Sequence, residues 1–157
     1  MILGFSIYSK KNVNISSKVL IIASWARIPS IIEISAMRNN SRFVLICDEA
    51  HAMQSLKSIR TQAALELCKS SHCVGVILAT GTPMKNGRPI NLFPLLVGIR
   101  HTLSLNKILF EKLYCNAKKT KFCSWDVSGA SNLPELRQKI GRKLLRKTKV
   151  YNRRSFH

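Results

Sequence analysis

Two adjacent acids followed by a histidine are the residues of this chain best suited to chemistry. Asp48 and Glu49 directly follow the apolar run FVLIC, and His51 stands two residues after Glu49. Such a run predicts a buried strand that delivers both carboxylates to its exposed end. Phosphoryl transfer needs a magnesium ion near the β and γ phosphates and a positioned attacking water. Asp48 suits the metal, through a coordinated water, and Glu49 suits the attacking water. His51 suits sensing of the nucleotide and contact with the motif of the next strand.

A second polar motif follows another apolar run. Thr80, Gly81 and Thr82 come after VGVILA, and Thr80 lies 32 residues beyond Asp48. Small hydroxyl side chains at a strand end can bridge a nucleotide site and a neighbouring lobe, and glycine permits a tight backbone turn. Alone, this motif favours an ordinary strand-to-loop turn, and the acidic pair alone fits a surface pair after a core strand equally well. Their combination favours nucleotide hydrolysis.

The elements that must position these motifs alternate between strand and helix. Continuous apolar runs predict three buried strands, over residues 19–25, 43–47 and 74–79. Helices are expected between and after them, over 31–38, 58–69, 90–99 and 105–114. Strand–helix–strand alternation predicts a parallel α/β sheet with right-handed crossovers. Ligands bind such sheets at the carboxyl ends of strands, which is where both polar motifs lie.

Two of the helices carry more specific expectations. In the helix over 58–69, Ile59, Ala63 and Leu67 repeat at i, i+4 and i+8 and are expected to form the buried face. In the helix that follows the threonine motif, Pro94 is expected to interrupt the helical backbone.

The chain becomes more polar towards its C-terminus. Residues 115–132 are rich in turn formers and predict a loop or an ordered insert. Ser131 and Asn132 are suited to cap a last helix that begins near Leu133 and Pro134.

Charge is the strongest compositional clue. The 157 residues include 26 Lys or Arg against seven Asp or Glu, a formal net charge of +19. Nine of the basic residues fall between 137 and 154, where there is no acidic residue. This charge favours a polyanionic partner, with nucleic acid ahead of an acidic membrane, over a soluble domain that merely happens to be basic.

The apolar runs and the cysteines bear on location. The longest runs, VLIIA and VGVILA, are too short to cross a membrane, and the first residues lack the pattern of a signal peptide. Five cysteines without CxxC spacing indicate reduced thiols. We therefore expect no membrane partner and no secretion, and a cytoplasmic (nucleoid-associated) or nuclear location.

Several segments together resemble the SWI/SNF-type branch of helicase superfamily two. ICDEAHAMQSLKSIRTQAALELC resembles its Walker B segment, ILATGTPMKNGRPINLFPLL its third helicase motif, and VLIIASWARIP the strand before Walker B. KLYCNAKKTKFCSWDVSGASNLPEL is similar to the annealing-helicase, SMARCA-like subgroup, and KLLRKTKV resembles the basic segment that closes the first motor lobe. The likeness covers roughly residues 19–150.

The resemblance implies part of a RecA-like lobe, a three-layer α/β fold with a parallel sheet flanked by helices, incomplete and followed by a basic C-terminal helix. It divides the chain into an ATP-binding lobe over 1–114, a polar insert over 115–132, and a basic helix with a divergent tail over 133–157.

The resemblance also implies movement along double-stranded or branched DNA, driven by ATP with Mg²⁺. It assigns Asp48 and Glu49 to nucleotide, metal and hydrolysis, and Thr80 to Thr82 to coupling between ATP and DNA. The residues that it places near DNA or the lobe interface are Arg60, Lys85, Asn86, Arg146, Lys147 and Lys149.

The sequence also departs from this family. It contains no GxxxxGK(S/T) phosphate loop, Asn91 stands where the family usually has Glu, and Lys147 stands where it usually has Arg. The tail YNRRSFH abandons the family pattern. The family's earlier motifs would precede residue 1, and its second lobe, with the arginine finger, would follow residue 157. We therefore expect a fragment of the motor that is inactive alone.

Two alternatives stay open beside this interpretation. The charge of +19 and the basic stretch 137–154 also suit a non-catalytic module that binds nucleic acid. The chain could equally be a subunit completed in trans by another chain that carries the phosphate loop and second lobe.

Overall fold

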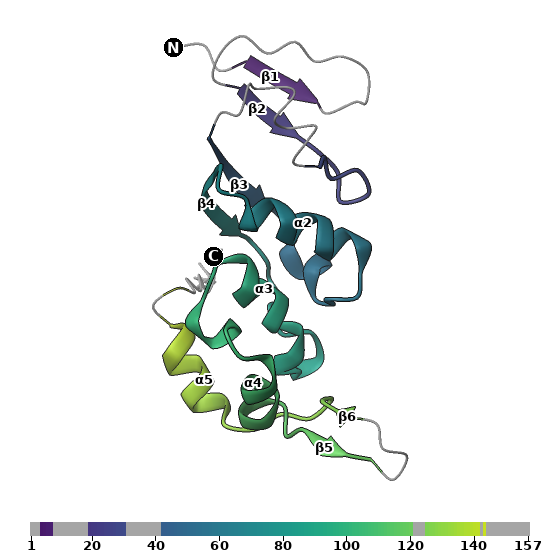
Figure 1. The fold of residues 1–157 in the computed structure, drawn as a ribbon, viewed down its shortest axis with the longest axis vertical. Coiled ribbons are helices and arrows are strands. Elements are labelled where there is room, and N and C mark those ends of the chain that lie inside the picture. The colour runs from purple at the N-terminus through teal and green to yellow at the C-terminus, as the bar shows by residue number, and fades with distance from the viewer. Residues whose placement is uncertain (1–3, 8–18, 31–41, 121–124, 142, 144–157) are drawn as a thin grey trace, which may run out of the picture.

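The structure is a computed structural model that describes residues 4–7, 19–30, 42–120, 125–141 and 143 (Figure 1). The helix expected over 31–38 and most of the basic stretch, including Arg146, Lys147 and Lys149, lie outside the described residues.

A parallel strand–helix–strand unit forms the middle of the molecule. Strand β3 (Phe43–Cys47) leads through helix α2 (Ile59–Lys69) to strand β4 (Cys73–Leu78), and the two strands pair in parallel. The register runs from Val44 opposite Gly75 to Cys47 opposite Leu78. The predicted order of elements is confirmed here, and the bounds of β3 are those that the apolar run predicts.

The prediction that these strands are buried on both faces is wrong. Side chains alternate along β3, so that Val44 is 54% exposed and Ile46 is 61% exposed, while Leu45 and Cys47 face the core. Val74 and Ile77 of β4 are exposed in the same way. Helix α2 covers one face of the pair, and no described element covers the other face (Figure 1). The described residues therefore show two layers of the expected three.

The buried face of α2 also differs from the predicted one. Ile59 in the first turn is 85% exposed, so it does not contribute to the core. The helix begins after Ser58, and the side chains that point inward start two residues later than expected. The buried stripe consists of Thr61, Ala64, Leu65, Leu67 and Cys68. A helical period gives the spacing of such a stripe but not its phase when small residues such as Ala and Thr share the core.

A second pair of parallel strands lies above β3 in Figure 1, on the side away from β4. Strands β1 (Gly4–Ile7) and β2 (Val19–Ile22) pair from Gly4 opposite Val19 to Ile7 opposite Ile22. The predicted strand over 19–25 is too long, because the backbone N–H of Arg27 closes a turn onto the Ser24 carbonyl at 2.9 Å. Ile22 is 48% exposed, so the prediction of a buried strand is wrong at this position as well.

The C-terminal half packs three helices around an aromatic cluster. Helices α3 (Phe93–Gly98), α4 (Lys107–Tyr114) and α5 (Leu133–Ile140) bury Phe93, Phe110 and Tyr114. The Phe93 and Phe110 ring centroids lie 5.1 Å apart, and those of Phe110 and Tyr114 lie 5.2 Å apart. These tilted ring pairs stabilise the core beyond the burial of their area.

Pro94 begins a helix rather than interrupting one. A 3-10 turn (Pro89–Asn91) precedes α3, and Pro94 occupies its first turn. Proline is well tolerated there because the first N–H groups of a helix have no partner within the helix. Two further 3-10 turns, Lys85–Gly87 and Thr102–Ser104, complete the connections of this half.

The polar stretch 115–132 contains a small hairpin. Strands β5 (Lys118–Lys119) and β6 (Trp125–Asp126) pair in antiparallel fashion. Helix α5 starts where predicted, but the Asn132 side chain does not cap it. Its amide instead donates to the Leu113 carbonyl at 2.9 Å, which anchors the start of α5 to α4. The boundaries of the insert stay a prediction.

Burial of the thiols predicts a loss of stability at alkaline pH. Desolvation raises the pKa of Cys47 and of Cys115 to about 11 and that of Cys68 to about 12, from a value of 9.0. The folded chain therefore retains protons that the unfolded chain releases, so this stability is present below pH 9 and is lost as the pH rises through 11 to 12.

We expect the free energy of unfolding in urea to fall measurably between about pH 8.5 and pH 10.5. Cysteine alkylation followed by mass spectrometry provides the control, since these three thiols should react far more slowly in the folded chain than in urea. An unfolding free energy that stays constant over this range would contradict the prediction.

Candidate active site

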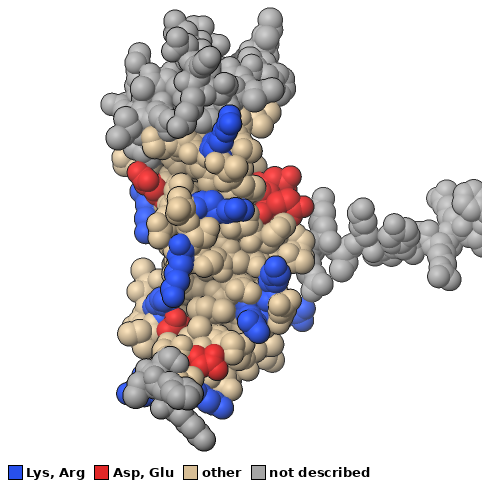
Figure 2. Space-filling view, turned by 90° about the vertical axis from the view of Figure 1, so that its right-hand side faces the viewer, with Lys and Arg blue, Asp and Glu red and all other residues tan. Residues whose placement is uncertain are grey.

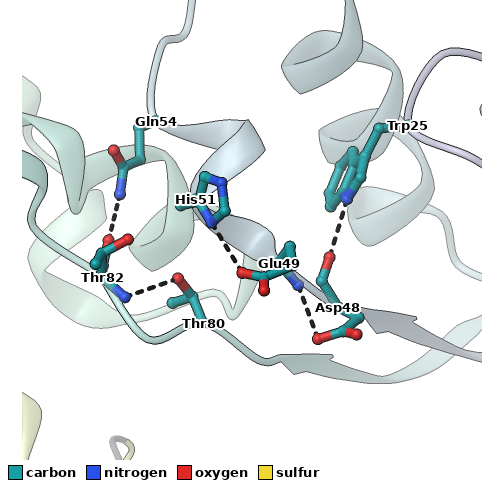
Figure 3. A network of polar contacts seen from close by, with 7 residues as sticks. All are labelled: Trp25, Asp48, Glu49, His51, Gln54, Thr80 and Thr82. Carbon is teal, nitrogen blue, oxygen red and sulfur yellow. Dashed lines mark hydrogen bonds and ion pairs between the residues drawn. The ribbon is translucent and has the colours of Figure 1, made fainter.

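The two predicted motifs meet at one end of the β3–β4 pair. The Ala79 N–H donates to the Cys47 carbonyl at 2.9 Å, and the Ala50 N–H donates to the Ala79 carbonyl at 2.8 Å. These bonds continue the strand ladder past its last residues and tie the backbone of the acidic motif to that of the threonine motif. The acidic pair and the threonine turn therefore lie side by side at the carboxyl ends of two parallel strands, as expected (Figure 3).

A left-handed residue separates the directions of the two acids. Glu49 has φ 49° and ψ 45°, a conformation that few residues other than glycine adopt. Its N–H donates to Asp48 Oδ1 at 2.9 Å, which fixes the Asp48 carboxylate against the turn. Both residues are exposed. Unfavourable backbone conformations of this kind gather at functional sites, where surrounding contacts maintain them.

His51 holds the Glu49 carboxylate rather than the threonine turn. Its Nδ1 lies 3.0 Å from Glu49 Oε2. The contact with the next strand's motif, which the sequence suggested for His51, is made by Gln54 instead. The Gln54 side-chain amide donates to the Thr82 carbonyl at 2.6 Å (Figure 3). Both residues come from the 3-10 turn Ala50–Met53 and its C-cap, so this turn connects the two motifs.

The threonine turn is shaped by a hydroxyl group rather than by its glycine. The Thr82 N–H donates to Thr80 Oγ1 at 3.1 Å, a side-chain turn typical of Ser and Thr. Gly81 is not in the left-handed region, and a Cβ added to it would meet no atom within 4 Å. The turn therefore does not use the backbone conformations that only glycine permits.

The residues expected near DNA lie on exposed segments. Arg60 is exposed in the first turn of α2, and Lys85 and Asn86 are exposed just after the threonine turn. Asn86 is left-handed, with φ 55°. The Asn91 side chain donates to the Lys85 carbonyl at 2.9 Å, so the residue that stands in place of the family's usual Glu supports this loop.

Two site residues were not found from the sequence. Gln54 lies three residues after His51, one turn further along, which is a signal that could have pointed to it. Trp25 offers no such signal, because its indole N–H donates to the Asp48 carbonyl across 23 residues of sequence, at 2.9 Å. The bond joins the segment after β2 to the acidic motif.

The donor set at the strand ends suits magnesium bound together with a nucleotide. Mg²⁺ is commonly held by one or two carboxylates, with substrate phosphates and water as its other ligands. Asp48 and Glu49 offer hard oxygen donors of this kind. No group of three or more His, Cys, Asp or Glu that could hold a metal occurs among the described residues.

Fold and motifs together define an α/β protein whose two polar motifs lie at the carboxyl ends of parallel strands, where such folds bind ligands. The sequence profile of the SNF2-related domain matches residues 6–155. The chain therefore belongs to the SNF2-related domain family, as the resemblance indicated, and this family implies a RecA-like α/β fold. The helices and small parallel sheets are consistent with part of such a fold.

Curated relatives cover much of this chain. It is 38% identical over 94 residues to the SWI/SNF-related matrix-associated actin-dependent regulator of chromatin subfamily A-like protein 1 of Bos taurus, covering 60% of this chain and 10% of that protein. It is 34% identical over 120 residues to the DNA annealing helicase and endonuclease ZRANB3 of Bos taurus, covering 74% of this chain and 11% of that protein.

The Caenorhabditis elegans homolog of the subfamily A-like protein 1 is 37% identical over 92 residues, covering 59% of this chain and 13% of that protein. The chain thus spans about a tenth of the length of the curated relatives it matches. No solved structure matches it. In the described part of the chain, no helix has the length and apolar character needed to cross a membrane.

Proposed function

We propose that this chain provides the hydrolysis and coupling segments of an ATP-dependent motor that acts on double-stranded or branched DNA. One observation carries the proposal. Asp48–Glu49 and Thr80–Thr82 lie next to each other at the ends of β3 and β4, joined by the bond from Ala50 to Ala79, in a chain of the SNF2-related family.

Each residue of the network has a role in this proposal. Mg²⁺, when bound with ATP, would supply charge neutralisation at the phosphates. Asp48, whose carboxylate accepts from the Glu49 N–H, would hold the metal through a water. Glu49 orients the attacking water and accepts its proton, and His51 positions the Glu49 carboxylate from 3.0 Å. Gln54 transmits the position of this turn to Thr82.

The basic residues complete the proposal. Arg60, Lys85 and Asn86 are exposed, and in this proposal they contact DNA or the second lobe. Arg146, Lys147 and Lys149, which lie outside the described residues, would add phosphate contacts. One relative's name describes a regulator of chromatin and another's a DNA annealing helicase, which supports a nuclear location and a DNA substrate. The phosphate loop and second lobe must come from elsewhere, in a longer chain or in trans.

The isolated chain of 157 residues is expected to release negligible phosphate from ATP, with or without duplex DNA. It contains no GxxxxGK(S/T) segment, so neither a nest of backbone amides nor a lysine of that motif holds the phosphates. The measurement is phosphate release in the presence of Mg²⁺ and duplex DNA, compared with Glu49→Gln. A DNA-stimulated rate that disappears in Glu49→Gln would contradict this expectation.

The proposed function itself is tested in a chimera. The part of this chain that matches the bovine annealing helicase, 74% of its length, replaces the matched part of that protein. Phosphate release stimulated by DNA is then measured in the chimera and in its Glu49→Gln variant. An inactive chimera that folds and still binds DNA would favour the second candidate function, a non-catalytic nucleic-acid-binding module. The net charge of +19 supports this candidate.

A further inference from the structure

Trp125 is an exposed aromatic residue on the small hairpin. It is 41% exposed and stands on β6, away from the candidate active site. Among the side chains whose exposure the structure describes, it is the only aromatic one that counts as exposed. An isolated exposed tryptophan needs no explanation by itself. The contacts that hold the Trp125 side chain indicate a binding role.

A buried carboxylate fixes the Trp125 ring. The indole N–H donates to Glu111 Oε2 at 2.9 Å, and Glu111 is only 5% exposed. The other oxygen of Glu111 lies 3.4 Å from Lys107 Nζ. Burying a carboxylate is unfavourable unless it is paired and hydrogen-bonded. Helix α4 therefore carries a buried acid whose two described contacts are an exposed lysine and the indole, and the indole is held in one orientation.

Two basic side chains lie beside the fixed ring: Lys119 across the hairpin, and Lys107, which shares the Glu111 carboxylate with the indole. Lys119 is paired with Trp125, so their side chains lie on the same face, while the next pair, Lys118 and Asp126, points to the opposite face. Figure 1 places β5 and β6 at the lower end of the molecule, and Figure 2 shows Lys and Arg side chains there, with acidic side chains nearby and further basic ones over the rest of this face.

We propose that the β5–β6 hairpin binds single-stranded DNA, with an unpaired base stacked on the Trp125 indole and the adjoining phosphates held by Lys119 and Lys107. A fixed aromatic platform beside basic side chains is how proteins bind single strands without sequence preference. A base inside a duplex has no free face for such stacking. The inference concerns binding of DNA in the absence of ATP, so it does not depend on the proposed hydrolysis of ATP at Glu49.

The first test reads the Trp125 environment directly. In a Trp25→Phe background, Trp125 is the only tryptophan of the full chain, so its fluorescence reports on the hairpin alone. Titration with oligothymidylate of about 12 nucleotides is expected to quench this emission, and the quenching should weaken as salt increases. Absence of quenching would overturn the proposal. So would equal quenching by an acidic peptide of matched charge, which would indicate a protein contact instead.

The second test separates stacking from charge. Trp125→Ala is expected to weaken binding to a duplex with a single-stranded tail by about 5- to 150-fold, the effect of losing one stacked base. Binding to a blunt duplex should change little, and Trp125→Phe should retain part of the affinity for the tail. Lys119→Ala should weaken binding to the single-stranded tail more than Lys69→Ala does. Lys69→Ala removes the same charge from an exposed position of helix α2. Equal losses on tailed and blunt DNA would overturn the proposal.

Discussion

Glu49→Gln is expected to slow DNA-stimulated phosphate release by the chimera with the bovine annealing helicase by about 10²–10⁴-fold, the usual contribution of a positioned general base. The change keeps the size of the side chain and an oxygen that can accept from His51, but removes the basic carboxylate that would take the proton of the attacking water. Binding of ATP and DNA should change much less than the rate, because Glu49 is proposed to act on the water and not on either ligand.

Glu66→Gln is the matched control for this prediction. It makes the same chemical change at an exposed position of α2, distant in sequence from both motifs. The chimera carrying Glu66→Gln should release phosphate at the rate of the unmodified chimera. If Glu49→Gln retains that rate as well, the assignment of Glu49 to hydrolysis is wrong, whatever the chimera's affinity for DNA.

The affinity of the isolated chain for duplex DNA is expected to fall by about 10³–10⁵-fold between roughly 50 and 200 mM salt, if six to ten phosphates are contacted. The reason is the net charge of +19, since each neutralised phosphate releases condensed counterions whose return is favoured by salt. Fluorescence anisotropy with two duplexes of unrelated sequence measures this dependence. The two sequences should behave alike, because phosphate contacts carry no base information.

Single substitutions locate the residues responsible for this binding. Lys85→Ala should lower the slope of log affinity against log salt by about one unit if its ammonium group contacts a phosphate. Lys69→Ala, on α2, should leave the slope unchanged. A flat response of the unmodified chain over this salt range would contradict phosphate-driven binding altogether.

The sequence was sufficient to predict the strand–helix–strand unit and the meeting of the two motifs. FVLIC predicted the bounds of β3, and the register of Cys47 opposite Leu78 confirms that both motifs follow neighbouring parallel strands. This part was predictable because the carboxyl ends of parallel strands joined by one helix must lie at the same edge. The family was likewise evident from local motifs.

Features set by distant parts of the chain could not be predicted in this way. The exposure of Val44 and Ile46 depends on what covers the second face of the sheet, which an apolar run does not reveal. The bonds from Trp25 to Asp48 and from Trp125 to Glu111 join residues far apart in sequence. The left-handed backbone of Glu49 is not indicated by its residue type, and the residues on either side of it are bonded to distant segments, Asp48 to Trp25 and Ala50 to Ala79.

Whether the acidic motif and the threonine turn act as one unit is measured most directly by a double-mutant cycle in the chimera. Glu49→Gln removes the proposed base, and Thr80→Val removes the hydroxyl that holds the Thr82 N–H. Residues that act as a unit give non-additive losses, so the double variant should release phosphate about as slowly as Glu49→Gln alone. Losses that multiply, as for two independent sites, would contradict a shared hydrolysis site at the ends of β3 and β4.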